Sequence, residues 1–454
     1  MKKVISVLLC AAFLFVMVAA CAREESAPAA PGPAGTTAAN GAQEPAAPES
    51  TLTVQGVTDT EILIGTTFVA SGPMAFIGMP IIDTIQAVFA RVNAHGGIDG
   101  RMLTLIHYDD GNDPVQGRIF LERLLEEDRV FGLISLSGVN APPSFEYLRE
   151  FGAPVVNITG GLAMMYREYD PGSNIFLIQP SNAFCGPFMI ARAISESLFG
   201  PNGDERLPDD AIIGMVYANN DAGHDSFAGA SAFAEEVGVS DRFIAEVVTA
   251  DTYPTVIQQF MAAGVDIVLV ATNDTRGFTA AMDDAGWLVP IIGAYGTSTI
   301  QSHSPEIFNP QRRILANTWA DYESPEAMLM LADLDDALTY HPTLDEATRI
   351  SYADNNFARA GYSSAITLVK ALERVSAAGL ELNWENFIWA MESEPFHIGG
   401  FGPFDFSGGR RMGITELALW EYIVTVGPGG EFIEDGPTIR TFESLETVLA
   451  RRND

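Results

Sequence analysis

Residues 62–113 contain the pattern that most constrains the fold of this chain. An apolar run ends at Ser71-Gly72-Pro73, a helical stretch stops at Gly96-Gly97, and a second apolar run ends at Asp109-Asp110. This order predicts a βαβ unit whose first loop presents small residues and exposed backbone groups at the carboxyl end of a strand. Open α/β sheets bind ligands at such loops, so the segment predicts a fold class and the first part of a binding site.

The same alternation of short apolar strands and amphipathic helices continues along the chain. A first series covers residues 59–178 and a second series of the same design covers residues 182–294. The two series predict two doubly wound α/β lobes, each a mostly parallel sheet with helices on both faces. The predicted strands are 62–69, 102–108, 130–136, 154–158, 175–178, 211–217, 243–248, 266–271, 291–294, 399–406 and 416–424. The predicted helices are 80–93, 113–128, 143–151, 188–199, 225–237, 256–263, 277–285, 326–340, 364–377 and 384–391.

Two of the predicted helix starts have a local chemical reason. Pro80 suits the first turn of a helix, where its missing N–H is not needed. Asp113, followed by Pro114, is a typical N-cap. We therefore read Asp109–Asp113 as a strand-end turn and helix cap rather than as a calcium loop, since it lacks the ligand spacing of an EF-hand.

Composition excludes one class of partner. The chain has 59 Asp and Glu against 25 Lys and Arg, a formal charge of -34. A nucleic-acid-binding protein needs a basic surface, and none is legible. The acidity favours solubility and mutual repulsion of molecules, while direct attraction of cationic ligands is the other interpretation.

The N-terminus has the features of an export signal. Lys2-Lys3 precede an apolar run over residues 4–18, and Ala19-Ala20 precede Cys21. The run is too short for a membrane span of about 20 residues, and no other segment reads as apolar enough to cross a bilayer. Small residues before a cysteine resemble a bacterial lipobox, which implies a signal peptide over 1–20 and a lipid on Cys21; plain secretory cleavage is the alternative. Residues 21–58 would then form a disordered tether, because they are rich in Ala, Pro and Gly and poor in large apolar residues.

No motif for catalysis, metals or cofactors is legible. Cys185 would be the one cysteine left beside Cys21 after signal cleavage, and we expect it to be a small buried residue. The six histidines are scattered without metal-binding spacing. There is no phosphate-binding loop and no nucleophile elbow. We therefore expect no cofactor, no metal and no catalytic residue, and a binding protein rather than an enzyme.

Several stretches of the chain occur in an order and spacing that resemble one family. They are 71–73, 93–101, 109–114, 126–136, 151–154, 219–223, 264–268, 361–365 and 399–406. Together they resemble the branched-chain amino acid (Leu/Ile/Val) type of ABC-transporter substrate-binding protein, a periplasmic binding protein of type I. The resemblance covers residues 59–433 and implies two lobes joined by three crossovers, near Pro180–Asn182, Thr318–Asp321 and Gly409–Gly413, with the ligand cleft between the lobes. The implied N-terminal lobe is 59–181 plus 320–410, and the implied C-terminal lobe is 182–319 plus 411–454.

The resemblance also implies a ligand site. In the N-terminal lobe the loops after the first, third and fourth strands would hold the polar head of the ligand with backbone N–H groups and hydroxyls. These residues are Ser71, Phe76, Ile77, Ser137, Gly138, Asn140, Thr159, Gly160 and Gly161.

The C-terminal lobe departs from the pattern of amino-acid binders. Ala222 stands where the family commonly has an aromatic residue, and Tyr295 stands where it commonly has the acid that pairs with a ligand ammonium group. Asp221 and Asp274 are the candidate replacements for that acid. If neither reaches the ligand, an aliphatic or aromatic acid or an amide would fit better than a zwitterionic amino acid.

These features together predict an exported, lipid-anchored monomer that binds no nucleic acid. It would capture an amino acid or a related small carboxylate or amide and deliver it to the transmembrane subunits of an ABC permease. The alternatives are a module that senses ligand for a membrane receptor, and a binder of aromatic acids or amides.

Overall fold

The computed structural model describes residues 54–138, 141–166, 170–197, 199, 205–272, 274–295, 309, 312–321, 324–353, 355–422, 424–426, 432–434, 438–439 and 441–453. The predicted signal peptide, Cys21, the tether up to residue 53 and the site residue Asn140 lie outside these residues.

The first sheet has five parallel strands in the order β2-β1-β3-β4-β5. Most apolar side chains of its strands are buried on both faces, as expected for a parallel sheet covered by helices, whereas the edge strand β2 is largely half-buried. Helices α1 and α10 pack on one face, and α2 and α3 pack on the other. The strands are β1 (Glu61–Thr67), β2 (Met102–Tyr108), β3 (Gly132–Ile134), β4 (Val155–Asn157) and β5 (Ile175–Leu177). The helices are α1 (Ala75–Ala94), α2 (Pro114–Glu122), α3 (Ala141–Phe151), α8 (Pro325–Leu338), α9 (Glu346–Ala353), α10 (Asn356–Ala377) and α11 (Trp384–Ser393).

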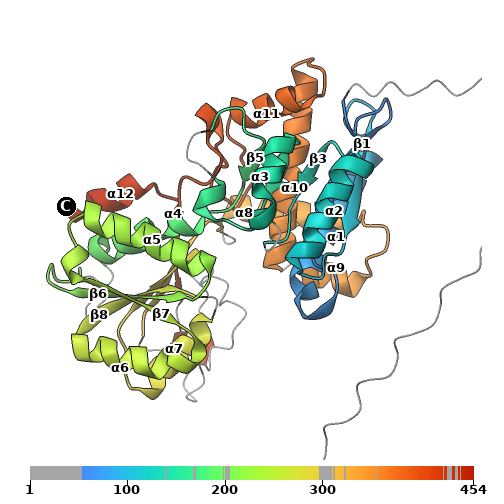
Figure 1. The fold of residues 1–454 in the computed structure, drawn as a ribbon. Helices are drawn as coiled ribbons and strands as arrows, with labels where there is room; N and C mark the ends of the chain where they lie inside the picture. The colour runs from blue at the N-terminus through green and yellow to red at the C-terminus, as the bar shows by residue number, and fades with distance from the viewer. Residues whose placement is uncertain are drawn as a thin grey trace, which may run out of the picture. The chain divides into compact units, whose positions relative to one another are not determined.

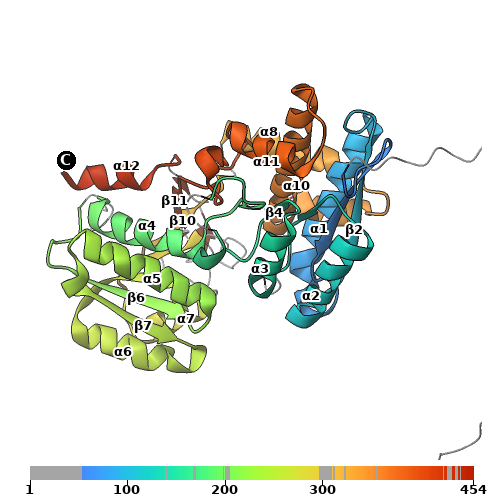
Figure 2. The same ribbon diagram turned by 45° about the horizontal axis from the view of Figure 1, so that its top comes forward.

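The second sheet repeats this order. Strands β7-β6-β8-β9-β10 are parallel, and β11 and β14 add antiparallel strands at the β10 edge. Helices α4 and α5 cover one face, and α6 and α7 cover the other (Figures 1 and 2). The strands are β6 (Ile212–Ala218), β7 (Phe243–Val248), β8 (Val265–Ala271), β9 (Ile291–Gly293), β10 (Ile314–Thr318), β11 (Ala418–Tyr422) and β14 (Thr438–Ile439), beside a separate β12 (Val424–Val426) and β13 (Phe432–Glu434) pair. The helices are α4 (Asn182–Ser195), α5 (Asp221–Glu236), α6 (Tyr253–Ala263), α7 (Thr275–Asp284) and α12 (Leu445–Ala450).

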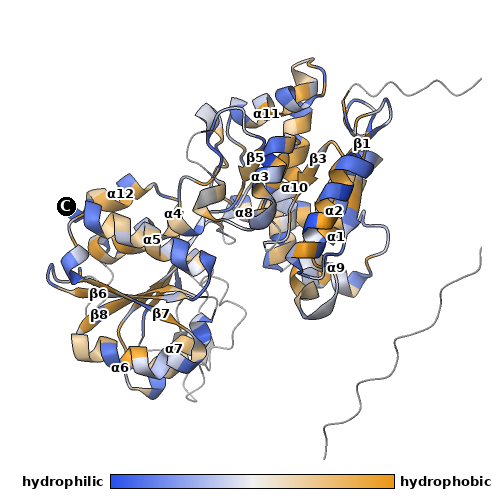
Figure 3. Cartoon of the chain, in the orientation of Figure 1, coloured by the Kyte–Doolittle hydropathy of each residue, from blue (hydrophilic) through white to orange (hydrophobic). Residues whose placement is uncertain are grey.

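The predicted pair of doubly wound α/β lobes is therefore confirmed. Figure 3 shows the strands of the second sheet as largely hydrophobic, with hydrophilic residues spread over the helices around them. The lobe boundaries implied by the resemblance stay a prediction.

Several predicted elements are wrong in their bounds or type; the helix predicted over 188–199, for example, is α4 (Asn182–Ser195). Helix α1 begins at Ala75, directly after a 3₁₀ turn (Gly72–Met74), so Pro80 lies inside the helix rather than in its first turn. Helix α10 begins at Asn356, with Asn355 as its N-cap. Gly361 lies inside this helix, where α1 packs so closely that an added Cβ would come 2.7 Å from the Ile81 carbonyl oxygen. The predicted strand at 399–406 consists only of isolated bridges at Phe401 and Phe404.

The prediction that no segment beyond the signal is apolar enough to cross a bilayer is wrong for one helix. The helical stretch Gly72–Ala94 is long and apolar enough by length and composition. Its apolar residues nevertheless pack in the core of the first lobe against α10. A buried core helix passes the same test of length and composition, and the packing favours that explanation here.

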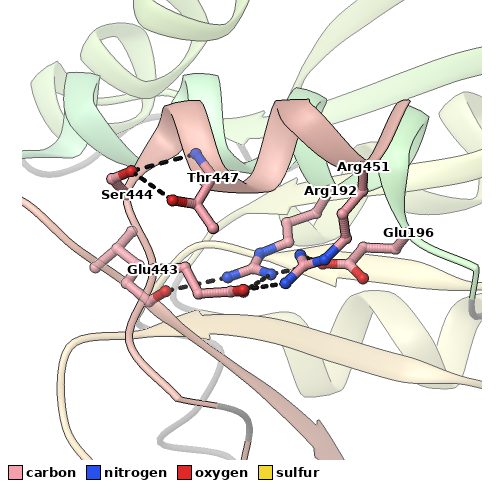
Figure 4. A network of polar contacts seen from close by, with 7 residues as sticks. Arg192, Glu196, Glu443, Ser444, Thr447 and Arg451 are labelled. Atoms are coloured by element: carbon pink, nitrogen blue, oxygen red, sulfur yellow. Dashed lines mark hydrogen bonds and ion pairs between the residues drawn. The ribbon is translucent and has the colours of Figure 1, made fainter. Parts of the chain in front are cut away.

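A buried ion cluster joins the helix that opens the second lobe to the last helix of the chain (Figure 4). The Arg192 side chain is fully buried and donates to Glu196 Oε1 at 2.5 Å, Glu443 Oε2 at 2.8 Å and the Leu417 carbonyl oxygen at 3.0 Å. Arg451 also pairs with both carboxylates. Because Arg192 and the two carboxylates are almost wholly out of water, their charges depend on one another for compensation, and Arg451 adds to the cluster from its partly exposed side.

We expect Glu443→Gln to destabilise the protein in a pH-dependent way. Burial alone would raise the pKa of the Glu443 carboxyl, but hydrogen bonds from Arg192 and Arg451 hold it below its ordinary value. A folded-state pKa below the unfolded one gives a stabilisation that is complete above the unfolded pKa, about 4.3, and lost as pH falls through the folded-state pKa. Urea unfolding of both proteins should show a deficit in the variant at about pH 7 that shrinks from about pH 5 towards pH 3. A deficit of constant size over that range would contradict the assignment.

Candidate functional site

The first half of the candidate site lies where the order of the first sheet reverses, between β1 and β3. Thr66 Oγ1 donates to the Ser135 carbonyl oxygen at 2.9 Å, and the Ser137 amide donates to the Thr67 carbonyl oxygen at 3.1 Å. These bonds tie the carboxyl ends of the two strands together. Ser137 is buried and Gly138 is exposed beside this junction. Ligands of open α/β sheets occupy such reversal points.

The loop after β4 lies against the same junction. Thr159 Oγ1 donates to the Leu136 carbonyl oxygen, and an added Cβ on Gly138 would come 3.6 Å from the Gly160 amide nitrogen. Gly160 has a positive φ of 67°, which favours glycine. Among the described residues, the N–H groups of Gly160 and Gly161 have no hydrogen-bond acceptor. The structure thus brings Ser137, Gly138, Thr159, Gly160 and Gly161 together, with the Thr159 hydroxyl proton already used within the protein.

The remaining predicted residues of this lobe belong to the segment after β1. The Ser71 hydroxyl bonds to Asp109, whose carboxylate also accepts from the Ala70 amide at 2.8 Å. Burial alone would raise the pKa of Asp109, but these hydrogen bonds lower it. Phe76 is 61% exposed, with an edge-on contact to Phe357, and Ile77 is half-buried. Within the described chain, no hydrogen bond joins Ser71, Phe76 or Ile77 to the loops after β3 and β4.

The second half of the candidate site is a hollow of about 70 Å³ where the order of the second sheet reverses, between β6 and β8. Helix α5 approaches the end of β6 closely there, since a Cβ on Gly223 would come 2.1 Å from the Ala218 carbonyl oxygen. Every described residue that lines the hollow is uncharged. They are Asn182, Ala218, Asn220, Ala222, Gly223, Ser226, Ala271, Thr272, Ala294 and Tyr295.

The predicted residues of the second lobe separate into two groups. Ala222 and Tyr295 line the hollow, whereas Asp221 and Asp274 do not. Asp221 is exposed at the start of α5. The Asp274 carboxylate caps α7 by accepting from the Gly277 amide at 3.0 Å, and it also accepts from the Tyr253 hydroxyl at 3.1 Å.

Tyr295 lies beside Cys185 in the second lobe. Desolvation raises the pKa of the half-buried Tyr295 phenol, so it is a neutral hydroxyl near neutral pH. Desolvation likewise raises the pKa of Cys185 to about 12, although a hydrogen bond with the Tyr295 backbone opposes it. Cys185 is fully buried, which confirms the prediction of a small core residue.

Sequence reasoning missed most of the lining of the hollow, such as Asn220 and Thr272, and also two residues that bind the loop after β4. Asn182, the first residue of α4, donates to the Gly161 carbonyl oxygen from its backbone amide at 2.9 Å and from Nδ2 at 3.2 Å. Asp225 Oδ2 in α5 accepts from the Ala163 amide at 2.6 Å. No local pattern marks either residue, because each contact joins segments that are distant in sequence.

Comparison with known proteins places these features in one family. The family model described as periplasmic binding protein matches residues 61–425. The Leu/Ile/Val-binding protein homolog 2 of Brucella abortus (strain 2308) is 31% identical over 93 residues, which is 20% of this chain and 25% of that relative. The alignment thus spans a quarter of the curated relative.

Solved structures share the fold over most of the chain. A fatty acid ABC transporter substrate-binding protein from Thermomonospora curvata has a TM-score of 0.64 and 18% identity, covering 87% of this chain and 95% of that one. An ABC transporter substrate-binding protein from Desulfitobacterium hafniense, in complex with Leu, has a TM-score of 0.59 and 17% identity, covering 82% and 99%. An ABC transporter solute-binding protein from R. palustris, in complex with benzoate, has a TM-score of 0.58 and 16% identity, covering 83% and 96%. The bound molecules differ in class, so this likeness bears on the fold alone.

Proposed function

The chain belongs to the periplasmic binding protein family, and from that premise we propose that it captures a small organic carboxylate or amide for uptake. The ligand would bind between the two lobes outside the cytoplasm and pass to the transmembrane subunits of an ABC permease. Binding would act by population shift, because a ligand that touches both lobes stabilises the closed arrangement without any bond being made or broken.

One observation carries the choice of ligand class: all the described residues that line the hollow in the second lobe are uncharged. A buried ammonium group needs a paired charge, and none of the lining residues supplies one. Neutral amides and hydroxyls from Asn182, Asn220, Thr272 and Tyr295 suit an uncharged polar or partly apolar group instead. The amides of Gly160 and Gly161 in the first lobe suit a carboxylate or amide oxygen.

The mode of attachment is part of the proposal. Cleavage before Cys21 and lipidation of its sulfur would hold a monomer at the outer face of a membrane through the tether that follows. Export over the signal at residues 1–20 would place the protein outside the cytoplasm.

We expect benzoate or octanoate to stabilise the purified protein more than L-leucine does. A ligand that binds only the folded state adds about 4 kcal/mol at about 1,000 times its dissociation constant. Differential scanning fluorimetry with the three compounds, and with benzamide as the matched neutral probe, measures the rise in Tm. A larger shift with L-leucine would contradict the ligand class and would indicate an acidic side chain of the protein near the ammonium group of the ligand. Consumption of any bound compound would contradict a pure binding role.

A further inference from the structure

The loop that follows β4 in the first lobe is held from the second lobe by two side chains. Its Gly161 carbonyl oxygen accepts from Asn182 of α4, and its Ala163 amide donates to the carboxylate of Asp225 in α5, 62 residues away in sequence. Ala163 opens a three-residue 3₁₀ turn (Ala163–Met165), and the preceding Leu162 provides no side-chain cap. Asp225 therefore satisfies an amide that the first lobe leaves uncapped.

Helices α4 and α5 form a firm support for these two contacts. They approach so closely that a Cβ on Gly186 would come 2.4 Å from the Ala230 amide nitrogen, and one on Gly229 would come 2.1 Å from the Ala183 carbonyl oxygen. Backbone contact at this distance leaves little room for the two helices to shift against each other. Asn182 and Asp225 thus hold the loop through two hydrogen-bonding groups, the Gly161 carbonyl and the Ala163 amide, which are two residues apart.

We infer that Asp225 is a positioning residue, which together with Asn182 fixes the Gly160–Gly161 peptides from the opposite lobe. A hydrogen bond from an amide to a carboxylate is stronger than one between neutral groups, so Asp225 is the stronger of the two anchors. The segment that it anchors contains the Gly160 and Gly161 amides, which have no hydrogen-bond acceptor among the described residues. This role rests on the proposed function only in so far as those amides bind ligand.

The test compares Asp225→Ala, Asp225→Asn and Glu235→Ala without ligand. Glu235 is an exposed acid on the same helix, so its replacement is a matched loss of one negative charge. Hydrogen–deuterium exchange of peptides covering residues 159–166 should rise about tenfold or more in Asp225→Ala, because exchange reports local opening. Asp225→Asn keeps an acceptor oxygen and should rise less, and Glu235→Ala should match the wild type. Unchanged exchange in Asp225→Ala, or an equal rise in Glu235→Ala, would overturn the inference.

A second measurement separates the inference from the proposed function. Titration with benzoate, octanoate and L-leucine should show that Asp225→Ala lowers the affinity for each compound that the wild type binds by a similar factor. A change of specificity would instead alter the ratios between these affinities. Raised exchange with unchanged affinity would overturn the positioning role. Failure of the wild type to bind any small organic acid or amide would instead refute the proposed function, and the exchange result would still decide whether Asp225 holds the loop.

Discussion

Replacement of Arg192 by alanine should lower the free energy of unfolding by about 3–5 kcal/mol, the usual cost of removing one partner from a buried ion pair. The Arg192 side chain is fully buried between Glu196 and Glu443. Without it, the two carboxylates stay in a water-poor site and lose a fully buried counter-charge, whereas the other described arginine of the cluster, Arg451, is 31% exposed. Urea unfolding at about pH 7, followed by tryptophan fluorescence and by circular dichroism, measures the loss.

Arg123→Ala is the matched control for this prediction. Arg123 pairs with Glu127 at the same four-residue spacing, but the two side chains are 49% and 74% exposed. Exposed pairs contribute about 1 kcal/mol or less, so its unfolding midpoint should move little. If Arg192→Ala is no more destabilising than Arg123→Ala, the buried cluster does not stabilise the fold.

Replacement of Tyr295 by aspartate should weaken the binding of benzoate or octanoate at least about a hundredfold. Tyr295 lines the uncharged hollow of the second lobe. A carboxylate introduced there would lack a counter-charge among the lining residues and would repel an anionic ligand, and like charges brought together cost several kcal/mol. The same variant should bind L-leucine more tightly relative to benzoate than the wild type does, because its ammonium group gains a partner. Isothermal titration calorimetry with both compounds measures the ratio.

Tyr295→Phe separates the hydroxyl group from the ring. It removes one hydrogen-bonding group and keeps the shape, so we expect a loss of about tenfold or less. Equal affinities of wild type and Tyr295→Asp for benzoate would show that the hollow does not hold the ligand. Thermal unfolding of each variant without ligand checks that the fold is retained.

Local patterns predicted most of the secondary structure, because the spacing of apolar residues and the turn residues are set within a few positions of the chain. The strand at Met102–Tyr108 matches its predicted range, and Asp113 caps α2 as expected, with its carboxylate accepting from the Val115 amide at 2.8 Å. Strand β10 was missed because its short run, Ile314–Thr318, is buried at every position inside the second sheet and therefore shows no alternation of apolar and polar residues. Helix α9 was missed because none of its residues is buried, which leaves no apolar periodicity to read.

The sequence by itself determined the two α/β lobes and the strand ends that carry the candidate site. Hydrophobic period and turn residues act over a few positions, so a chain's own order reveals them. Only the tertiary structure decided that the hollow is lined by Tyr295 and Ala222 but not by Asp221 or Asp274, and that Asp225 reaches the loop of the other lobe. Those outcomes depend on the direction of side chains at a sheet edge and on contacts between residues far apart in sequence. An aspartate that caps its own helix, such as Asp274, and one that bonds to the other lobe, such as Asp225, are the same residue type in the sequence. Only packing distinguishes their roles.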